Sequence, residues 1–257
     1  MVPVAGALHY PQFCSSRWTD AAKTCAAVSS SAETCSSVEV PADLIKGITV
    51  CKDSPSTGCG TSTPNGAGIA GADLLLLVTA VEGGSCGGAT QAYATSCATD
   101  EFDRPIVGRV NFCRSALDDK SDDAKSKAVG TTMHELAHVL GFSSNSFRKF
   151  RDSNGAARSP EKSTQYTCGG STRSTYGLVN TVASFPERGA ATCGVDPVWV
   201  ESGTKCVFKM VTPAVLRRSR DFFDCETLNG LELENQPTSG ACTMIGSHWE
   251  QVRARRA

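Results

Sequence analysis

Two histidines four residues apart, His134 and His138, constrain the fold of this chain more than any other feature. In an α-helix, positions i and i+4 lie on the same face, so both imidazole rings can reach one metal ion. Zinc accepts neutral imidazole nitrogens at about 2.0–2.1 Å, and a catalytic zinc keeps one coordination position open for water. Glu135 directly follows the first histidine, where its carboxylate can take a proton from that water. We therefore expect a helix that holds one Zn²⁺ ion beside a general base.

The residues around this motif favour a helix. Ser121 or Asp122 can cap its start, helix-compatible Asp, Ala and Lys residues follow, and Gly141 can turn the chain at its end. These features predict a helix over Asp122–Leu140. The alternative is a surface helix with two incidental histidines. Because the chain has only four histidines and two of them stand at ligand spacing, we favour the pattern of a zinc peptidase.

A catalytic zinc needs a third protein ligand. The compact zinc-peptidase pattern, with a histidine three residues after the glycine, would place it at Ser144, and serine cannot serve in the same way. The two remaining histidines are His9 and His248. His9 lies in an N-terminal stretch without an evident element, which argues against a ligand role, but the residues by themselves leave both histidines open.

Several segments together resemble the leishmanolysin family of zinc metallopeptidases. They are His-Glu-Leu-Ala-His-Val-Leu-Gly-Phe-Ser at 134–143, Val-Thr-Pro-Ala-Val-Leu-Arg at 211–217, Cys-Glu-Thr-Leu at 225–228, Leu-Glu-Leu-Glu at 231–234 and Gly-Ser-His at 246–248. Segments 73–78, 94–97 and 105–111 are similar to the family's catalytic-domain strands, so the resemblance covers roughly residues 35–248. In that family a long insertion precedes the third histidine. The resemblance therefore implies His134, His138 and His248 as metal ligands and Glu135 as the catalytic base.

The resemblance also implies an α+β fold: a metzincin-like catalytic domain with a twisted mixed sheet, a zinc-binding active-site helix and a long disulfide-rich insertion before the third ligand. We divide the chain into a Cys/Ser-rich N-terminal segment (1–60), an N-terminal catalytic subdomain with the zinc helix (61–144), and the insertion with the start of the C-terminal catalytic subdomain (145–257). The implied function is that of a zinc-dependent endopeptidase, with protein or peptide substrates as partners.

The family places a methionine-containing turn downstream of the third histidine. None of the four methionines follows His248. We therefore expect a chain truncated after the third ligand, and the alternative to an active enzyme is a catalytically inactive surface, adhesion or binding protein that keeps the fold.

Thirteen cysteines without any C-x-x-C pair favour disulfides over a zinc ribbon. Disulfides persist in secreted or lumenal proteins, so we expect a secreted or cell-surface protein, although the first residues show no signal peptide. The odd count leaves at least one cysteine free or separated from its partner. A net charge of −1 gives no electrostatic reason for a nucleic-acid partner. No apolar run reaches the ~18–20 residues that a membrane-spanning helix needs.

Hydrophobic patterning predicts the remaining elements. Strands are expected at about 73–81, 91–98 and 106–112, and the last of them resembles the edge strand along which the family binds extended peptide. Residues 1–60 show a helical patch near Asp20–Val28 and little else, and Ser143 to about Lys205 is polar and loop-like. A second helix begins at Thr212 and runs to about Phe223. Its core-facing side chains are expected to be Val215, Leu216, Phe222 and Phe223.

Overall fold

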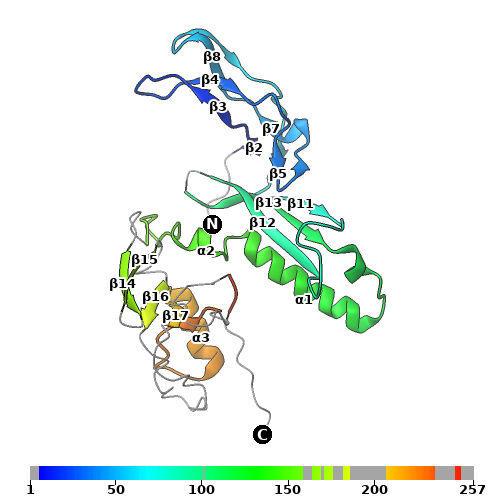
Figure 1. Ribbon diagram of the computed structural model, residues 1–257, viewed down its shortest axis with the longest axis vertical. Coiled ribbons are helices and arrows are strands. Elements are labelled where there is room, and N and C mark those ends of the chain that lie inside the picture. The colour runs from blue at the N-terminus through cyan, green and yellow to red at the C-terminus, as the bar shows by residue number, and fades with distance from the viewer. Residues whose placement is uncertain are drawn as a thin grey trace. The chain divides into compact units, whose positions relative to one another are not determined.

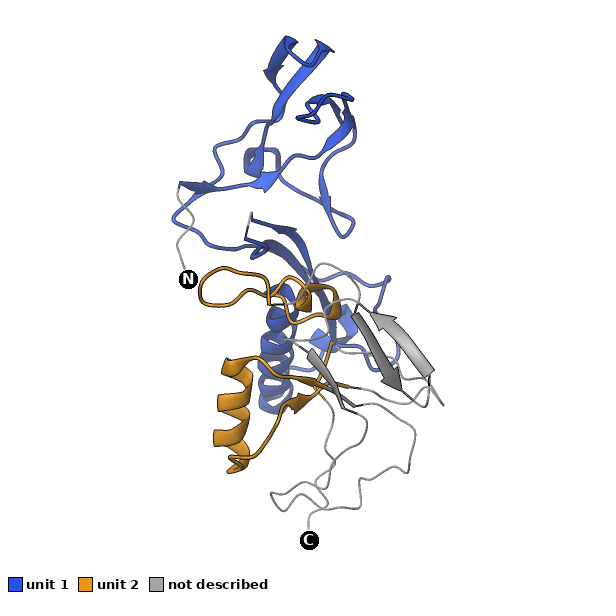
Figure 2. Ribbon diagram, turned by 90° about the vertical axis from the view of Figure 1, so that its left-hand side faces the viewer, with its two compact units in different colours: residues 1–140 blue, residues 141–257 orange. Residues whose placement is uncertain are grey.

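The computed structural model describes residues 6–100, 102–158, 164–168, 171–175, 182–185, 207–234 and 247–249. These residues contain both helix and sheet, together with several disulfides. The chain divides into two compact units, Met1–Leu140 and Gly141–Ala257, which Figure 2 colours separately. The three-segment division that the sequence suggests stays a prediction. Within the described ranges, no helix combines the length and the apolar character needed to cross a bilayer.

Short paired strands are the main elements of residues 6–70. Two antiparallel hairpins are formed by β3 (Cys14–Arg17) with β4 (Cys25–Val28) and by β8 (Thr49–Ser54) with β9 (Thr57–Thr61). Figure 1 shows them at one end of the first unit. The other pairs are two residues long: β1 (Ala7–Leu8) with β10 (Ile69–Ala70), β2 (Tyr10–Pro11) with β7 (Ile45–Lys46), and β5 (Thr34–Cys35) with β6 (Val38–Glu39). A 3₁₀ turn, η1, spans Ala42–Leu44.

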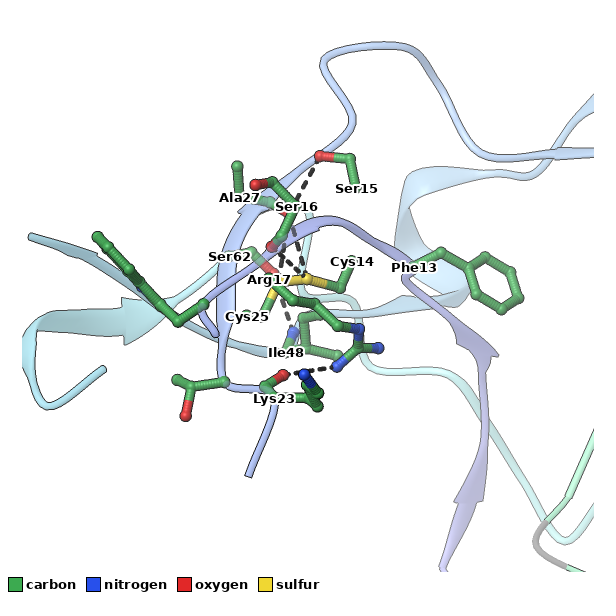
Figure 3. The surroundings of a disulfide bond; sticks show 12 residues. Phe13, Cys14, Ser15, Ser16, Arg17, Lys23, Cys25, Ala27, Ile48 and Ser62 are labelled. Carbon is green, nitrogen blue, oxygen red and sulfur yellow. Dashed lines mark hydrogen bonds between the residues drawn. A yellow bond between two sulfur atoms is a disulfide. The ribbon is translucent and has the colours of Figure 1, made fainter. Parts of the chain in front are cut away.

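The helical patch predicted near Asp20–Val28 is wrong, because that stretch is the turn and second strand of the β3–β4 hairpin. A disulfide joins Cys14 to Cys25 across the hairpin (Figure 3). The guanidinium of Arg17 donates a 2.9 Å hydrogen bond to the carbonyl oxygen of Lys23 on the other side of the turn. In the turn, the Asp20 carboxylate accepts hydrogen bonds from the backbone and the hydroxyl of Thr24. A covalent cross-link and an aspartate-centred turn therefore override the helix-compatible composition.

One buried cluster joins these short strands to the main sheet of the first unit. Leu8, Tyr10 and Ile45 pack with residues of that sheet, among them Leu75 and Val107. Since two-residue strands have little stability of their own, this shared core helps to hold the N-terminal segment against the sheet.

The main sheet has three strands in the order β11–β13–β12. β11 (Leu75–Thr79) runs parallel to β13 (Pro105–Phe112), and β12 (Ala92–Thr99) runs antiparallel to it. The three strands predicted from the sequence are confirmed. The expectation that Ile106–Phe112 is an edge strand is wrong, because β13 pairs on both sides and its main-chain groups are already used. Helix α1 (Asp122–Val139) packs against β12 and β13 (Figure 1).

Two long-range connections tie the N-terminal strands to this sheet. A disulfide joins Cys35 on β5 to Cys97 on β12, across 62 residues of sequence. The buried guanidinium of Arg109 on β13 donates hydrogen bonds to the main-chain oxygen of Ser36 and, at 3.1 Å, to the hydroxyl of Thr79. A second disulfide, between Cys86 and Cys113, fixes the loop before β12 to the end of β13. The sheet that supports α1 is thus anchored on two sides.

The described residues of the second unit form two helices, a two-stranded sheet and a three-stranded sheet. Helices α2 (Ser144–Phe147) and α3 (Pro213–Phe223) are joined in sequence by strands. These are β14 (Thr164–Cys168), β15 (Ser171–Thr175), β16 (Val182–Phe185) and β17 (Val207–Met210), followed after α3 by β18 (Leu231–Glu232). Strands β16, β17 and β18 form one antiparallel sheet. The loop prediction for residues 143–205 is therefore wrong at α2 and at β14–β16. Strands β14 and β15, which pair with each other, are rich in threonine, a residue that favours strands.

Helix α3 starts as predicted, with Thr212 at its cap and Pro213 in its first turn. The prediction that Phe222 and Phe223 face the core is wrong, because their exposed fractions are 81% and 43%. The buried position of the helix is Ser219, one turn earlier. The helix ends at a left-handed Asp224, and the two phenylalanine rings instead contact each other edge to face.

Candidate metal centre

Local interactions at its first turn start helix α1 at the predicted place. Ser121 is the N-cap, and its hydroxyl accepts a hydrogen bond from the backbone N–H of Ala124. Asp122 and Asp123 place negative charge beside the positive end of the helix dipole. The backbone N–H and then the hydroxyl of Ser121 lower the pKa of the Asp119 carboxyl below its usual range, where the chain turns into the helix.

The helix places the rings of His134 and His138 one turn apart on one face. Their Nε2 atoms are 3.0 Å apart and the rings meet edge to face. Two nitrogen ligands at ordinary zinc distances on a tetrahedral ion lie roughly 3.3 Å apart, so the pair fits the ligand geometry of one such ion. The structure therefore brings these two predicted ligands together.

Glu135 is buried, with an exposed fraction of 6%. Together with His134 it lines an open pocket of ≈ 330 Å³ between α1 and the start of β12. The other lining residues come from α1, from the start of β12 and, with Gln91, from the residue before it. The Thr131 hydroxyl donates a 2.9 Å hydrogen bond to the side-chain oxygen of Gln91 in the pocket wall. Sequence reasoning did not identify this polar pair, since residues 40 positions apart carry no local signal of contact. The pocket places a carboxylate and an imidazole beside an edge strand.

The end of the helix is fixed by a glycine and by close packing. Helix α1 ends at Val139, and Gly141 has a φ of 107°, a backbone conformation that glycine adopts without strain. This confirms the predicted role of Gly141 as the turning point. Val139 is fully buried against the sheet, directly after His138.

His248 belongs to the second unit, in the short described segment 247–249. Its Nδ1 atom lies 2.7 Å from Oε2 of Glu234, and its main-chain oxygen accepts a hydrogen bond from the backbone N–H of Glu234. Leu233 and Trp249 form an isolated antiparallel bridge beside this pair. Glu234 was not among the predicted site residues, and nothing in its sequence position distinguished it from its neighbour Glu232.

The residues that follow α1 contact both neighbours of His248 within the second unit. The backbone N–H of Ser144 donates to the hydroxyl of Ser247 at 3.4 Å. The ring of Phe142 lies 4.5 Å, centroid to centroid, from that of Trp249. The segment that begins three residues after His138 therefore holds the segment that carries His248.

His9 has partners of its own in the first unit. Its Nδ1 atom is 2.9 Å from the main-chain oxygen of Ala7, and its Nε2 atom is 3.2 Å from that of Gly66. Both ring nitrogens thus lie beside main-chain carbonyl oxygens, and the single N–H of a neutral ring can donate to one of them. The expectation that His9 has no ligand role stays a prediction.

Known proteins similar to this chain are peptidases. The sequence matches the family model described as leishmanolysin over residues 46–256. A leishmanolysin-like peptidase of Caenorhabditis elegans is 33% identical over 222 residues, 85% of this chain and 32% of that protein. One of Drosophila pseudoobscura pseudoobscura is 32% identical over 228 residues, 84% of this chain and 31% of that protein. A ciliated left-right organizer metallopeptidase of Xenopus laevis is 28% identical over 244 residues, 93% of this chain and 29% of that protein. The chain spans about a third of the length of these relatives.

Proposed function

Because this chain belongs to the leishmanolysin family of peptidases, we propose that it is a zinc-dependent endopeptidase that hydrolyses peptide bonds in proteins. The observation that carries the proposal is the arrangement on one helix of two histidines with adjacent Nε2 atoms and a buried glutamate beside a pocket. We assign His134, His138 and His248 as the protein ligands of one catalytic Zn²⁺ ion.

The chemistry of the donor set supports zinc. Three neutral imidazoles with one open position suit a hydrolytic zinc site. When bound, zinc supplies Lewis acidity, which makes a water molecule more acidic near neutral pH and polarises a peptide carbonyl.

Glu135 performs the proton transfers in this proposal. Its carboxylate accepts the proton of the attacking water and returns it to the amine that leaves when the peptide bond breaks. Its position supports this role, since it lines the same pocket as His134 and is withdrawn from bulk solvent. A general base of this kind contributes about 10²–10⁴-fold to the rate.

We propose that the substrate binds as an extended strand along β12. Among the described residues, β12 pairs only with β13, so its other edge can accept main-chain hydrogen bonds from a peptide. Ala92, the first residue of β12, lines the pocket that contains His134 and Glu135. A peptide paired with this edge would pass beside the catalytic carboxylate.

The disulfides support a site of action outside the cell. Cross-links such as Cys35–Cys97 persist in oxidising compartments and are rare in the cytosol. We therefore propose that the protein is secreted or displayed at the cell surface.

Cleavage of denatured casein by the oxidatively refolded chain tests the proposal. We expect hydrolysis that a zinc chelator abolishes and that Glu135→Ala and Glu135→Gln reduce by at least ~10²-fold, with zinc content unchanged. A folded, zinc-loaded chain that does not hydrolyse casein would instead support a binding role. Hydrolysis that survives the Glu135 substitutions would exclude the assigned mechanism.

A further inference from the structure

Two short segments of the second unit are aligned so that Glu234 and His248 face each other. The Leu233–Trp249 bridge sets the antiparallel alignment, and Leu233 is fully buried. The backbone N–H of Glu234 donates to the main-chain oxygen of His248 at 2.8 Å. The main chains of the two residues are therefore fixed relative to each other before their side chains interact.

The two side chains form a short hydrogen bond whose donor can be identified. Oε2 of Glu234 lies 2.7 Å from Nδ1 of His248. An ionised carboxylate has no proton to donate, so Nδ1 must carry the hydrogen of this bond. In the neutral ring this leaves the lone pair on Nε2, the atom that a metal ion can take.

This pair is poorly explained as a stabilising ion pair. The exposed fractions of the two side chains are 45% for His248 and 26% for Glu234. Contacts between charged groups this exposed contribute little to folding stability. The hydrogen bond that Nδ1 of His248 donates to Glu234 instead matches the arrangement in which a metal-bound histidine donates its other ring N–H to a carboxylate.

We propose that Glu234 is the positioning residue of the third metal ligand: it fixes the tautomer and the ring orientation of His248 so that Nε2 is presented to the ion. This inference rests on the proposed function, in which His248 is a zinc ligand. The backbone around His248 is held through Ser247 and Trp249, and the hydrogen bond to Glu234 restrains the rotation of the imidazole itself.

Zinc affinity, measured by chelator competition at one fixed pH, tests this role without relying on turnover. We expect Glu234→Ala to weaken zinc binding about 10–100-fold, the usual effect of losing such a partner. Glu234→Gln keeps an oxygen that can accept the hydrogen bond but loses its charge, so its effect should be smaller. Glu226→Gln, which removes an exposed carboxylate elsewhere in the same unit, should leave the affinity unchanged.

The absorption spectrum of the Co²⁺-loaded chain gives a second readout. A ring that is bound but badly oriented changes the ligand geometry, so the visible bands of Glu234→Ala should shift or weaken, while those of Glu226→Gln should match the unaltered chain. Thermal unfolding of the metal-free variants excludes misfolding as the cause, and Glu234→Gln provides a conservative variant if Glu234→Ala does not fold.

A parallel His248→Ala variant separates the two possible failures. If His248→Ala weakens zinc binding and neither Glu234 variant does, the positioning role is wrong while the third-ligand assignment stands. If His248→Ala leaves zinc binding unchanged, the ligand assignment of the proposed function is itself wrong. We expect weaker zinc binding in the His248 variant and in both Glu234 variants, with a smaller effect for Glu234→Gln than for Glu234→Ala.

Discussion

Gly108, in the middle of the central strand β13, faces Val139, the last residue of α1, so closely that a Cβ atom at position 108 would collide with a methyl group of Val139 and approach the main-chain oxygen of Thr95. Val139 is fully buried and directly follows His138. The absence of a side chain at Gly108 therefore sets how near the helix that carries the histidine pair can come to the sheet.

Gly108→Ala should destabilise the protein by about 1–3 kcal/mol, because the added methyl group overpacks the interface between α1 and β13. Denaturant unfolding measures the effect. Gly130→Ala is the matched control: its Cβ would meet nothing within 4 Å, and in a helix interior alanine is favoured over glycine by about 0.5–1 kcal/mol. The two substitutions should thus change the free energy of unfolding in opposite directions. Adding Val139→Ala to Gly108→Ala should recover part of the lost stability, because it removes the methyl groups that the new Cβ atom meets. If the effects of the two substitutions on the free energy of unfolding are simply additive, the predicted contact is wrong.

His248→Ala and His9→Ala should differ sharply in zinc affinity. Loss of a direct ligand should weaken zinc binding by more than the roughly 10–100-fold caused by loss of an outer partner. His9 is engaged by the main-chain oxygens of Ala7 and Gly66, so its removal should leave zinc binding unchanged. Isothermal titration of the metal-free chains measures both. If zinc affinity falls for His9→Ala and not for His248→Ala, His9 rather than His248 is the third ligand.

Removing the Cys35–Cys97 disulfide should cost more stability than removing Cys51–Cys59. The first closes 62 residues and the second only 8, so the loop-entropy relation gives roughly 4 and 2.5 kcal/mol. Paired alanine substitutions and equilibrium unfolding test the order. Because Cys97 lies on β12, loss of the first cross-link should also increase amide hydrogen exchange in that strand, an effect not expected for the second. The reverse order of stability would show that native-state packing outweighs chain entropy.

Acid should affect the β3–β4 turn through Asp20. The hydroxyl of Thr24 is the largest cause that holds the pKa of the Asp20 carboxyl below its usual range. Since the folded-state pKa is lowered, the contribution of this group to stability is present above its unfolded pKa and is lost as pH falls through the folded pKa. Thr24→Val should raise the pKa of Asp20 toward its ordinary value. Carboxyl-carbon NMR measures it, and an unchanged midpoint would refute the role of the hydroxyl.

Helices α1 and α3 and the main sheet could be predicted because their signals are local. Ser121 as cap, a mostly helix-compatible run and Gly141 as turning point define α1, and apolar runs identify the three strands of the sheet. Phe222 and Phe223 were misplaced because apolar character alone does not say where the packed face of α3 ends. The N-terminal hairpins were missed because cross-links and turns, rather than periodicity, define them.

By itself, the sequence determined the identity of the histidine pair and the glutamate between them, since helical spacing and side-chain chemistry need no distant partner. Only the tertiary structure decided that β12, rather than β13, lies at an edge of the described sheet, that Gly108 has no room for a side chain beside Val139, and that Glu234 meets His248. Glu234 and His248 are 14 positions apart, and Arg109 and Ser36, which also meet, are 73 apart. Contacts across such separations depend on how strands pair and pack, and no local pattern of residues encodes that pairing.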